Sequence, residues 1–144
     1  MTTRVPILSL KDIRKSYGPV AVLHGVDFEV YPGEVVALLG ENGAGKSTLS
    51  GIIAGSVQPS GGQMTWQGAP YEPANPREAL DSGVGLIHQE LRLLPHLTIA
   101  ENVFVGRYPM KAGRLDRKLM EERAHAGLQR LGLDISPRRK VDGL

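Results

Sequence analysis

Hydrophobic and polar positions alternate over the N-terminal part of the chain, in two segments, Ile7–Tyr17 and Val20–Val30. Such alternation is typical of strands with one solvated face, and the apolar phase of the first segment shifts between Leu10 and Ile13. We therefore expect Ile7–Tyr17 to form an edge strand with an irregularity. We expect Val20–Val30 to form a second strand, one face of which carries Val22, His24, Val26, Phe28 and Val30. A tight turn is expected after it, at Tyr31–Glu34.

Val35–Leu39 has a different pattern, an uninterrupted apolar run, and Val84–His88 is similar. Both runs are typical of strands buried on both faces of a parallel sheet. Between them, apolar residues at helical spacing follow Lys46, and a short strand is predicted at Gln63–Gln67. Further helices are indicated by N-cap signals: Asn75 before Pro76, Thr98 with Glu101, and Asp116 before an apolar face of Met120, Ala124, Gly127, Leu128 and Leu131. Strands that alternate with helices after Val35 predict an α/β fold with a parallel sheet and an antiparallel addition at its N-terminus.

Length and composition place the chain among globular domains. Its 144 residues correspond to about one domain, and 41% of them are hydrophobic, which is enough for a core. The absence of cysteine excludes disulfides and thiolate metal sites, and no apolar run is long enough for a membrane-spanning helix. With 17 basic and 15 acidic residues the net charge is only +2, so nucleic acid is not expected as a partner. The histidines lack metal-ligand spacing: His24, His88, His96 and His125.

A glycine-rich segment joins the first apolar run to the helix that begins at Lys46. Residues Gly40–Ser47 match the pattern G-x-x-x-x-G-K-[ST] of a phosphate-binding loop. Glycines let the loop curl until successive N–H groups point at phosphate oxygens, and the helix dipole acts on the same anion. Lys46 would supply a positive charge to the β- and γ-phosphates, and the Ser47 hydroxyl would ligate Mg²⁺. The residues expected to bind ATP in this loop are Gly40, Asn42, Gly43, Ala44, Gly45, Lys46, Ser47 and Thr48.

These residues also resemble a known family. Gly40–Thr48, preceded by Tyr31–Glu34 and by Tyr17, resembles the nucleotide-binding domain of ATP-binding cassette (ABC) proteins. Gly83–Gly106, with Gln-Glu-Leu and then Ala-Glu-Asn, is similar to the sugar-import branch of that family, the energising subunits of ribose, xylose and galactoside permeases. The resemblance covers nearly the whole chain. It implies an α/β P-loop NTPase core with an N-terminal antiparallel β subdomain.

The resemblance assigns roles to residues outside the loop. Tyr17 would stack on adenine; the alternative is a strand-end tyrosine that packs on its neighbours. Gln89 would ligate Mg²⁺ and contact the attacking water, as a catalytic residue together with Lys46; the alternative is an amide that satisfies strand-end backbone groups. Glu90–Arg107 would contact the transmembrane permease subunits, although its leucines also suit a small core.

Other parts of the family's catalytic machinery are missing from this sequence. Between Gln89 and Leu144 there is no apolar run followed by Asp-Glu and no Ser-Gly-Gly, which occurs only at Ser60–Gly62. The last residues, Val141–Leu144, resemble those that lead into the family's signature motif. We therefore expect residues 1–144 to be the N-terminal part of one nucleotide-binding domain, truncated before the signature motif, with negligible hydrolysis of its own.

The function expected of the parent protein is that of the ATP-binding subunit of an ABC-type carbohydrate importer. It would couple the binding and hydrolysis of ATP, with Mg²⁺, to sugar transport on the cytoplasmic side of the inner membrane. Its expected partners are permease subunits, a second nucleotide-binding domain and, indirectly, a periplasmic sugar-binding protein. Three alternatives stay open at this point: a soluble ABC ATPase that acts on ribosomes or DNA, a P-loop small-molecule kinase, and a nucleotide-binding interaction module.

Overall fold

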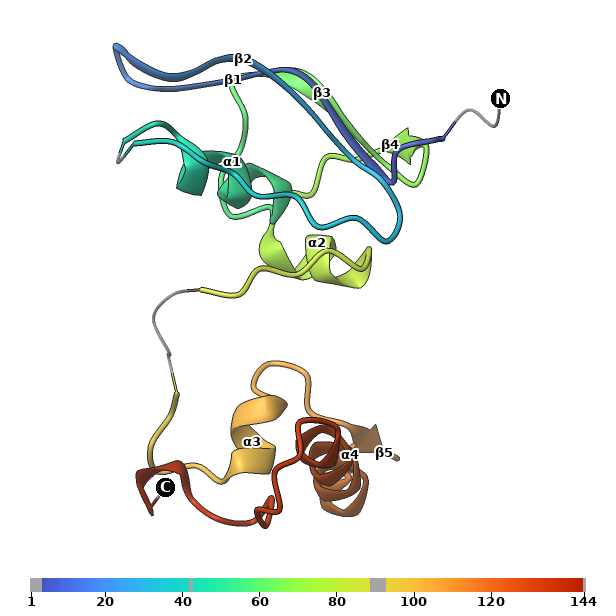
Figure 1. Ribbon diagram of the computed structural model, residues 1–144. Helices are drawn as coiled ribbons and strands as arrows, with labels where there is room; N and C mark the ends of the chain where they lie inside the picture. The colour runs from blue at the N-terminus through green and yellow to red at the C-terminus, as the bar shows by residue number, and fades with distance from the viewer. Residues whose placement is uncertain (1–3, 42, 89–92, 144) are drawn as a thin grey trace. The chain divides into compact units, whose positions relative to one another are not determined.

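The computed structural model of the chain describes residues 4–41, 43–88 and 93–143. Two of the predicted site residues, Asn42 and Gln89, lie outside the described residues. The chain divides into two compact units, Met1–Ile87 and His88–Leu144 (Figure 1). Each unit has a hydrophobic core of its own.

The first unit is built on a four-stranded antiparallel sheet with the strand order β2-β1-β3-β4 (Figure 1). Its strands are β1 (Leu8–Tyr17), β2 (Val20–Val30), β3 (Gly61–Trp66) and β4 (Ala69–Pro70). The predicted N-terminal strand pair is confirmed, because β1 and β2 pair from one end to the other. β3 hydrogen-bonds to the other side of β1, so β1 is an inner strand and not the predicted edge strand. The predicted pair therefore belongs to a larger antiparallel sheet.

The phase shift predicted between Leu10 and Ile13 is a β-bulge at Asp12. Two residues of β1, Lys11 and Asp12, face Asp27 alone on β2. Asp12 has a φ of 50°, and its N–H donates to Asp27 Oδ1 at 2.7 Å. The bulge turns both Leu10 and Ile13 toward the core, where both are fully buried, although strict alternation would place them on opposite faces.

Two short helices cover one face of this sheet (Figure 1). Helix α1 (Lys46–Ile53) buries Leu49 and Ile52 there, and helix α2 (Pro76–Asp81) buries Ala79. The predicted start of α2 is confirmed, since Asn75 Oδ1 accepts a hydrogen bond from Glu78 N at 3.0 Å. The buried core of the unit draws on the sheet, both helices and the β4–α2 connection: Leu8, Leu10, Ile13, Leu23, Leu49, Ile52, Met64, Tyr71 and Ala79.

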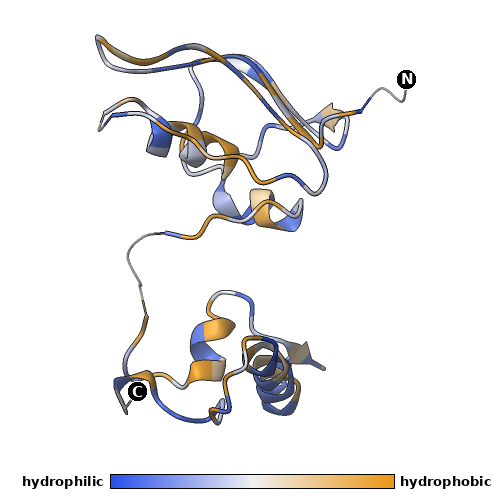
Figure 2. Ribbon diagram, viewed as in Figure 1, coloured by the Kyte–Doolittle hydropathy of each residue, from blue (hydrophilic) through white to orange (hydrophobic). Residues whose placement is uncertain are grey.

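Neither predicted buried strand is a strand in the described structure. Val35–Leu39 and Val84–His88 have no strand partner among the residues that the structure describes. Val35 is 98% exposed, Leu39 91% and Ile87 96%, and Figure 2 shows the first run as a hydrophobic stretch of ribbon between β2 and α1. A parallel strand needs hydrogen bonds from a neighbouring strand and covering layers on both faces. The described residues provide no such neighbour, so the expected parallel sheet is not formed in this part of the chain.

The predicted apolar face of β2 is also wrong at one point. Leu23 is buried, whereas His24 is exposed. The register between β1 and β2 shifts between Ile13 and Arg14, next to this point. A shift of register moves residues from one face of a strand to the other, which is why the alternation does not hold through the middle of β2.

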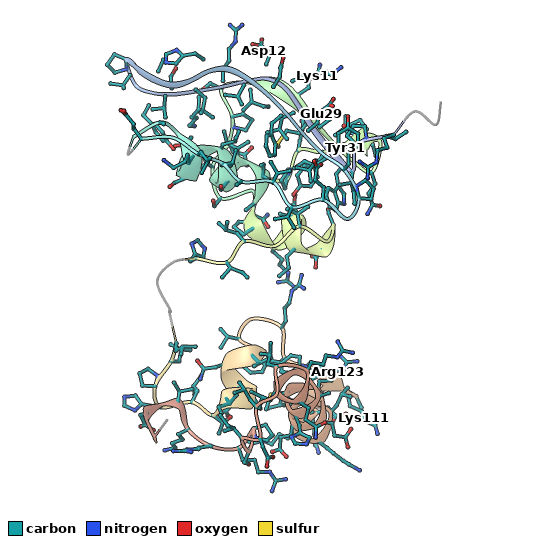
Figure 3. All side chains as sticks on the ribbon, in the orientation of Figure 1. Lys11, Asp12, Glu29, Tyr31, Lys111 and Arg123 are labelled. Atoms are coloured by element: carbon teal, nitrogen blue, oxygen red, sulfur yellow. The ribbon has the colours of Figure 1, made fainter. Side chains whose placement is uncertain are left out.

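The turn predicted at Tyr31–Glu34 is confirmed. Glu34 N donates to Tyr31 O at 3.1 Å, and Tyr31 N donates to Glu34 Oε2 at 2.8 Å. The Tyr31 hydroxyl donates to Glu29 Oε2 at 2.8 Å, and Figure 3 labels both side chains at this end of the sheet. This bond to a carboxylate raises the pKa of Tyr31 above its usual value.

The second unit has a smaller core between two helices. Helix α3 (Ile99–Val103) packs on helix α4 (Arg117–Arg130). In sequence, a hairpin of β5 (Met110–Lys111) and β6 (Arg114–Leu115) lies between them, and a 3₁₀ turn, η1 (Val141–Gly143), follows. The core residues are Ala100, Met120 and Ala124, with Phe104 packed against them. The predicted apolar face of α4 is thus only partly buried, because Gly127 and Leu131 are exposed.

Both helix starts predicted in this unit are confirmed. Thr98 and Glu101 form a capping box, in which Glu101 N donates to Thr98 Oγ1 at 3.1 Å and Thr98 N donates to Glu101 Oε2 at 2.9 Å. The hydrogen bonds from Thr98 hold the pKa of Glu101 below its usual value. Asp116 caps α4 by accepting a hydrogen bond from Leu119 N at 3.0 Å.

Gly62 on β3 accommodates the bulge, and its replacement tests how much the bulge depends on it. A Cβ on Gly62 would lie 2.7 Å from Ile13 Cα and against the carbonyl of Asp12, at a φ of +95°. Gly62→Ala is therefore expected to lower the free energy of unfolding by about 2–4 kcal/mol, through the clash and the left-handed backbone. Urea unfolding followed by the fluorescence of Trp66, the single tryptophan and a residue of β3, measures the loss.

Gly68→Ala is the matched control for Gly62→Ala. Gly68 also has a positive φ, +80°, but a Cβ there would meet open space. The control is expected to lose only about 1 kcal/mol, from the backbone conformation alone. Equal losses in the two variants would contradict the fit between Gly62 and the bulge.

Candidate functional site

The start of α1 is held against β2 by the absence of a side chain at Gly45. Gly45 is the N-cap residue of α1; it is buried and has a φ of 83°. A Cβ on it would lie 2.6 Å from Leu23 Cδ2 and 3.3 Å from Val22 O. Glycine is the residue that combines a left-handed backbone with so close an approach. The contact sets the position of the first turn of α1 relative to the sheet.

The Lys46 side chain folds back over the loop that precedes it. Its ammonium donates to Gly40 O at 2.6 Å and to Glu41 O at 2.7 Å. An ammonium has three donors, so these two bonds leave one for another acceptor. Within the loop, Ala44 N also donates a hydrogen bond to Glu41 O at 3.2 Å, which closes a turn. A loop wrapped around a positive charge at a helix N-terminus is suited to bind an anion.

The first turn of α1 presents backbone donors beside this lysine. The first hydrogen bond within the helix runs from Leu49 N to Gly45 O at 2.8 Å. Helix geometry therefore leaves the N–H groups of Lys46, Ser47 and Thr48 without acceptors in the helix. The structure brings together the predicted loop residues that it describes: Gly40, Gly43, Ala44, Gly45, Lys46, Ser47 and Thr48.

Tyr17 lies at the end of the sheet that is nearest to this loop. It ends β1, pairs with Val20 at the start of β2 and is 50% exposed. Val20 precedes Val22, which lies against Gly45, by two residues, or about 7 Å along a strand. Figure 1 shows the β1–β2 connection and the segment before α1 at the same end of the first unit. Tyr17 and the start of α1 are therefore neighbouring candidates for one binding site.

A lysine lies over the Tyr17 ring. Lys15 Nζ is 5.0 Å from the ring centroid, within the range of a cation–π contact. The same ammonium donates to Gln58 O at 2.7 Å. Lys15 is not among the site residues predicted from the sequence. Its spacing of two residues from Tyr17 on a strand, which places both side chains on one face, is the signal that points to it.

The Ser47 hydroxyl is one oxygen ligand that the described loop offers to a metal ion. Mg²⁺ prefers oxygen ligands, and the Ser47 hydroxyl at the exposed start of α1 fits that preference. Gln89, the other predicted Mg²⁺ ligand, is outside the described residues. Within residues 4–41, 43–88 and 93–143, no group of three or more His, Asp or Glu side chains is placed to hold a metal ion. A Mg²⁺ ion here would therefore depend on phosphate and water oxygens for most of its ligands.

Comparisons of sequence agree with this geometry. The sequence profile of the ABC transporter family matches residues 23–143. A ribose import ATP-binding protein of Rubrobacter xylanophilus is 47% identical over 139 residues, 96% of this chain. An arabinose import ATP-binding protein of Pectobacterium atrosepticum is 44% identical over 137 residues, 95% of this chain. The chain spans only 28% and 27% of the lengths of these two relatives.

A comparison of structures gives the same family. The ADP conformation of an ATP-binding cassette of an ABC transporter matches with a TM-score of 0.81 at 27% sequence identity, over 97% of this chain and 59% of that chain. The predicted class, an α/β P-loop NTPase with an N-terminal antiparallel β subdomain, is therefore confirmed, although two of its expected strands are not formed in the described residues. The matching profile, the relatives and the shared fold show that this chain belongs to the ABC transporter family.

Proposed function

We propose that this chain binds ATP with Mg²⁺ at the loop Gly40–Ser47. The observation that supports this most strongly is the position of the Lys46 ammonium, which is held by two loop carbonyls and keeps a donor for a phosphate oxygen. The first N–H groups of α1 and the positive end of its dipole act on the same anion. Asn42 and Thr48 would add donors to the phosphates, and the Ser47 hydroxyl would be a ligand of Mg²⁺, which would neutralise phosphate charge.

Tyr17 and Gln89 would complete the part of the site that this chain carries. The half-exposed Tyr17 ring can stack on adenine, since aromatic stacking tolerates any base. Gln89 would add an amide oxygen to Mg²⁺ and orient the attacking water, as a catalytic residue together with Lys46. A neutral amide is not a base, so proton removal from the water needs a carboxylate or histidine from elsewhere.

We further propose that the parent protein is the ATP-binding subunit of an ABC carbohydrate importer. Relatives named for ribose and arabinose import support this over an ATPase that acts on ribosomes or DNA, or a small-molecule kinase. Two nucleotide-binding domains would close over ATP and drive the permease subunits, with a periplasmic sugar-binding protein as an indirect partner. The protein would then lie at the cytoplasmic side of the inner membrane. Among the described residues, no helix has the length and apolar character needed to cross a bilayer.

The described part of Glu90–Arg107 offers an apolar surface for those permease subunits. Leu93, Leu94, Val103 and Val105 are each between 45% and 59% exposed, and none belongs to the buried core of the second unit. Asn102 holds this surface together, because its Oδ1 accepts from Leu94 N at 2.7 Å and its Nδ2 donates to Leu94 O at 3.0 Å. Exposed apolar side chains on an ordered loop and helix are suited to dock a partner.

Lys46→Met tests the phosphate site. A charged hydrogen bond to phosphate contributes about 1.5–3 kcal/mol, so the affinity for Mg·ATP is expected to fall about 10- to 150-fold. Calorimetric titration of the 144-residue chain measures it, and Trp66 fluorescence in urea reports any loss of stability. Lys11→Met makes the same charge change at an exposed position of β1 and should leave the affinity as it is. Unchanged ATP affinity in Lys46→Met would rule out the proposed site.

The chain by itself is expected to hydrolyse ATP negligibly. Lys46 would neutralise the phosphates, and Gln89 would position Mg²⁺ and the attacking water, but neither residue would remove a proton from that water. The sequence after Gln89 contains no apolar run followed by Asp-Glu that could supply a base. Release of inorganic phosphate from Mg·ATP, followed over hours at micromolar protein, measures this. Mg²⁺-dependent turnover that disappears in Lys46→Met would show that the chain carries a complete catalytic site.

Charges on the apolar surface test the contact with the permease. The double variant Val103→Asp/Val105→Asp places unpaired charges in the proposed interface and is expected to weaken capture by purified permease subunits of a ribose-type importer about tenfold or more. Leu131→Asp/Leu133→Asp is the matched control, because it adds the same two charges in the same unit but outside Glu90–Arg107, at positions that are 76% and 42% exposed. Equal capture of the two variants would argue against this surface.

A further inference from the structure

The bulge at Asp12 places two side chains of β1 on the helix-covered face of the sheet. Ile13 is fully buried on that face, and Lys15 and Tyr17 follow it at intervals of two residues. Lys15 is half-buried, whereas Arg14 beside it is exposed. The bulge therefore determines that Lys15 and Tyr17 lie on the side of the sheet that carries α1.

The Lys15 ammonium is held at a defined position on this face. Its Nζ donates to Gln58 O at 2.7 Å, in the loop that follows α1. This loop is tied to its surroundings, because Ser60 N donates to Arg14 O at 2.8 Å and Gln58 Nε2 donates to Pro73 O at 2.9 Å. The carbonyl that accepts from Lys15 is therefore part of an ordered loop, which keeps the ammonium at the end of β1.

The same ammonium covers one face of the Tyr17 ring. The distance of 5.0 Å from Lys15 Nζ to the ring centroid is within the range of about 6 Å over which a cation attracts an aromatic face. Lys15 thus joins the ring to a fixed carbonyl and restrains the ring against rotation. Tyr17 is 50% exposed, so part of its side chain stays accessible to a planar ligand.

We propose that Lys15 is a positioning residue that orients the Tyr17 ring for the adenine of ATP. The proposal rests on the proposed binding of ATP at the phosphate loop and adds a residue to it. A ring that is already held in place loses less rotational freedom when a base stacks on it, so binding is tighter. Because Lys15 acts through the ring, it contributes to the binding of the base and not to that of the phosphates.

The test compares Mg·ATP with Mg·tripolyphosphate, which lacks the base, by calorimetric titration of the 144-residue chain. Lys15→Met keeps the aliphatic stem and removes the ammonium, so ATP is expected to bind about 2- to 5-fold more weakly. Tripolyphosphate is expected to bind with unchanged affinity. Lys15→Arg retains a cation and a donor for Gln58 O and is expected to restore ATP affinity. Lys11→Met, on the same strand and labelled in Figure 3, should bind both probes as the original chain does.

A double-mutant cycle with Tyr17→Ala then separates action through the ring from other effects. Tyr17→Ala alone is expected to weaken ATP binding about 5- to 150-fold through the lost stacking. Lys15→Met added to Tyr17→Ala is expected to cause no further loss. A Lys15→Met loss that is equal for both probes, that persists without the ring, or that is absent for ATP would overturn the proposal.

The failure of this inference can be told apart from the failure of ATP binding. If tripolyphosphate binds and its binding depends on Lys46, while Tyr17→Ala leaves the ATP affinity unchanged, the phosphate site stands and the role of Lys15 is refuted. If neither probe binds the original chain, both proposals are refuted. Lys15→Gln gives the same comparison where Lys15→Met lowers the stability, because its amide can still donate to Gln58 O without a charge over the ring.

Discussion

The close approach of α1 to β2 at Gly45 is the constraint on which the site depends. Without a Cβ, Gly45 lies against Leu23 and the carbonyl of Val22, so the helix begins in contact with the sheet. Because it begins there, its first N–H groups and the Lys46 ammonium lie near the strand end that carries Tyr17. A side chain at this position would push the helix and its loop away from the sheet. The absence of one side chain therefore sets the distance between the phosphate loop and the aromatic ring.

The bulge at Asp12 connects the core of the first unit with the same site. It reverses the alternation of β1, so that Ile13 faces the core together with Leu10. The reversal also carries Lys15 and Tyr17 to the face that α1 covers. A regular strand would complete the core less well and would place these two side chains on the opposite face. One irregularity of the backbone thus serves both packing and the geometry of the candidate site.

Local signals in the sequence predicted the structure well, and signals that depend on distant partners did not. The N-caps at Asn75, Thr98 and Asp116 formed as expected, because each depends on a hydrogen bond to a residue three positions away. The apolar runs Val35–Leu39 and Val84–His88 were predicted as buried strands, but neither is a strand in the described structure, and Val35, Leu39 and Ile87 are 98%, 91% and 96% exposed. Their apolar character is real, but a strand also requires a hydrogen-bonded neighbour that the run itself does not specify.

The sequence by itself determined the phosphate loop, the helix starts and the turn after β2, because each of these depends on residues a few positions apart. It also determined the resemblance to a family, which rests on motifs spread along nearly the whole chain. Only the tertiary structure decided which runs become strands, which residue of β2 enters the core and which carbonyl accepts a hydrogen bond from Lys15 beside the Tyr17 ring. The contact between Lys15 and Gln58 joins residues 43 positions apart. Such a contact exists only after the bulge has turned β1 and α1 has packed on the sheet, so no pattern of neighbouring residues can specify it.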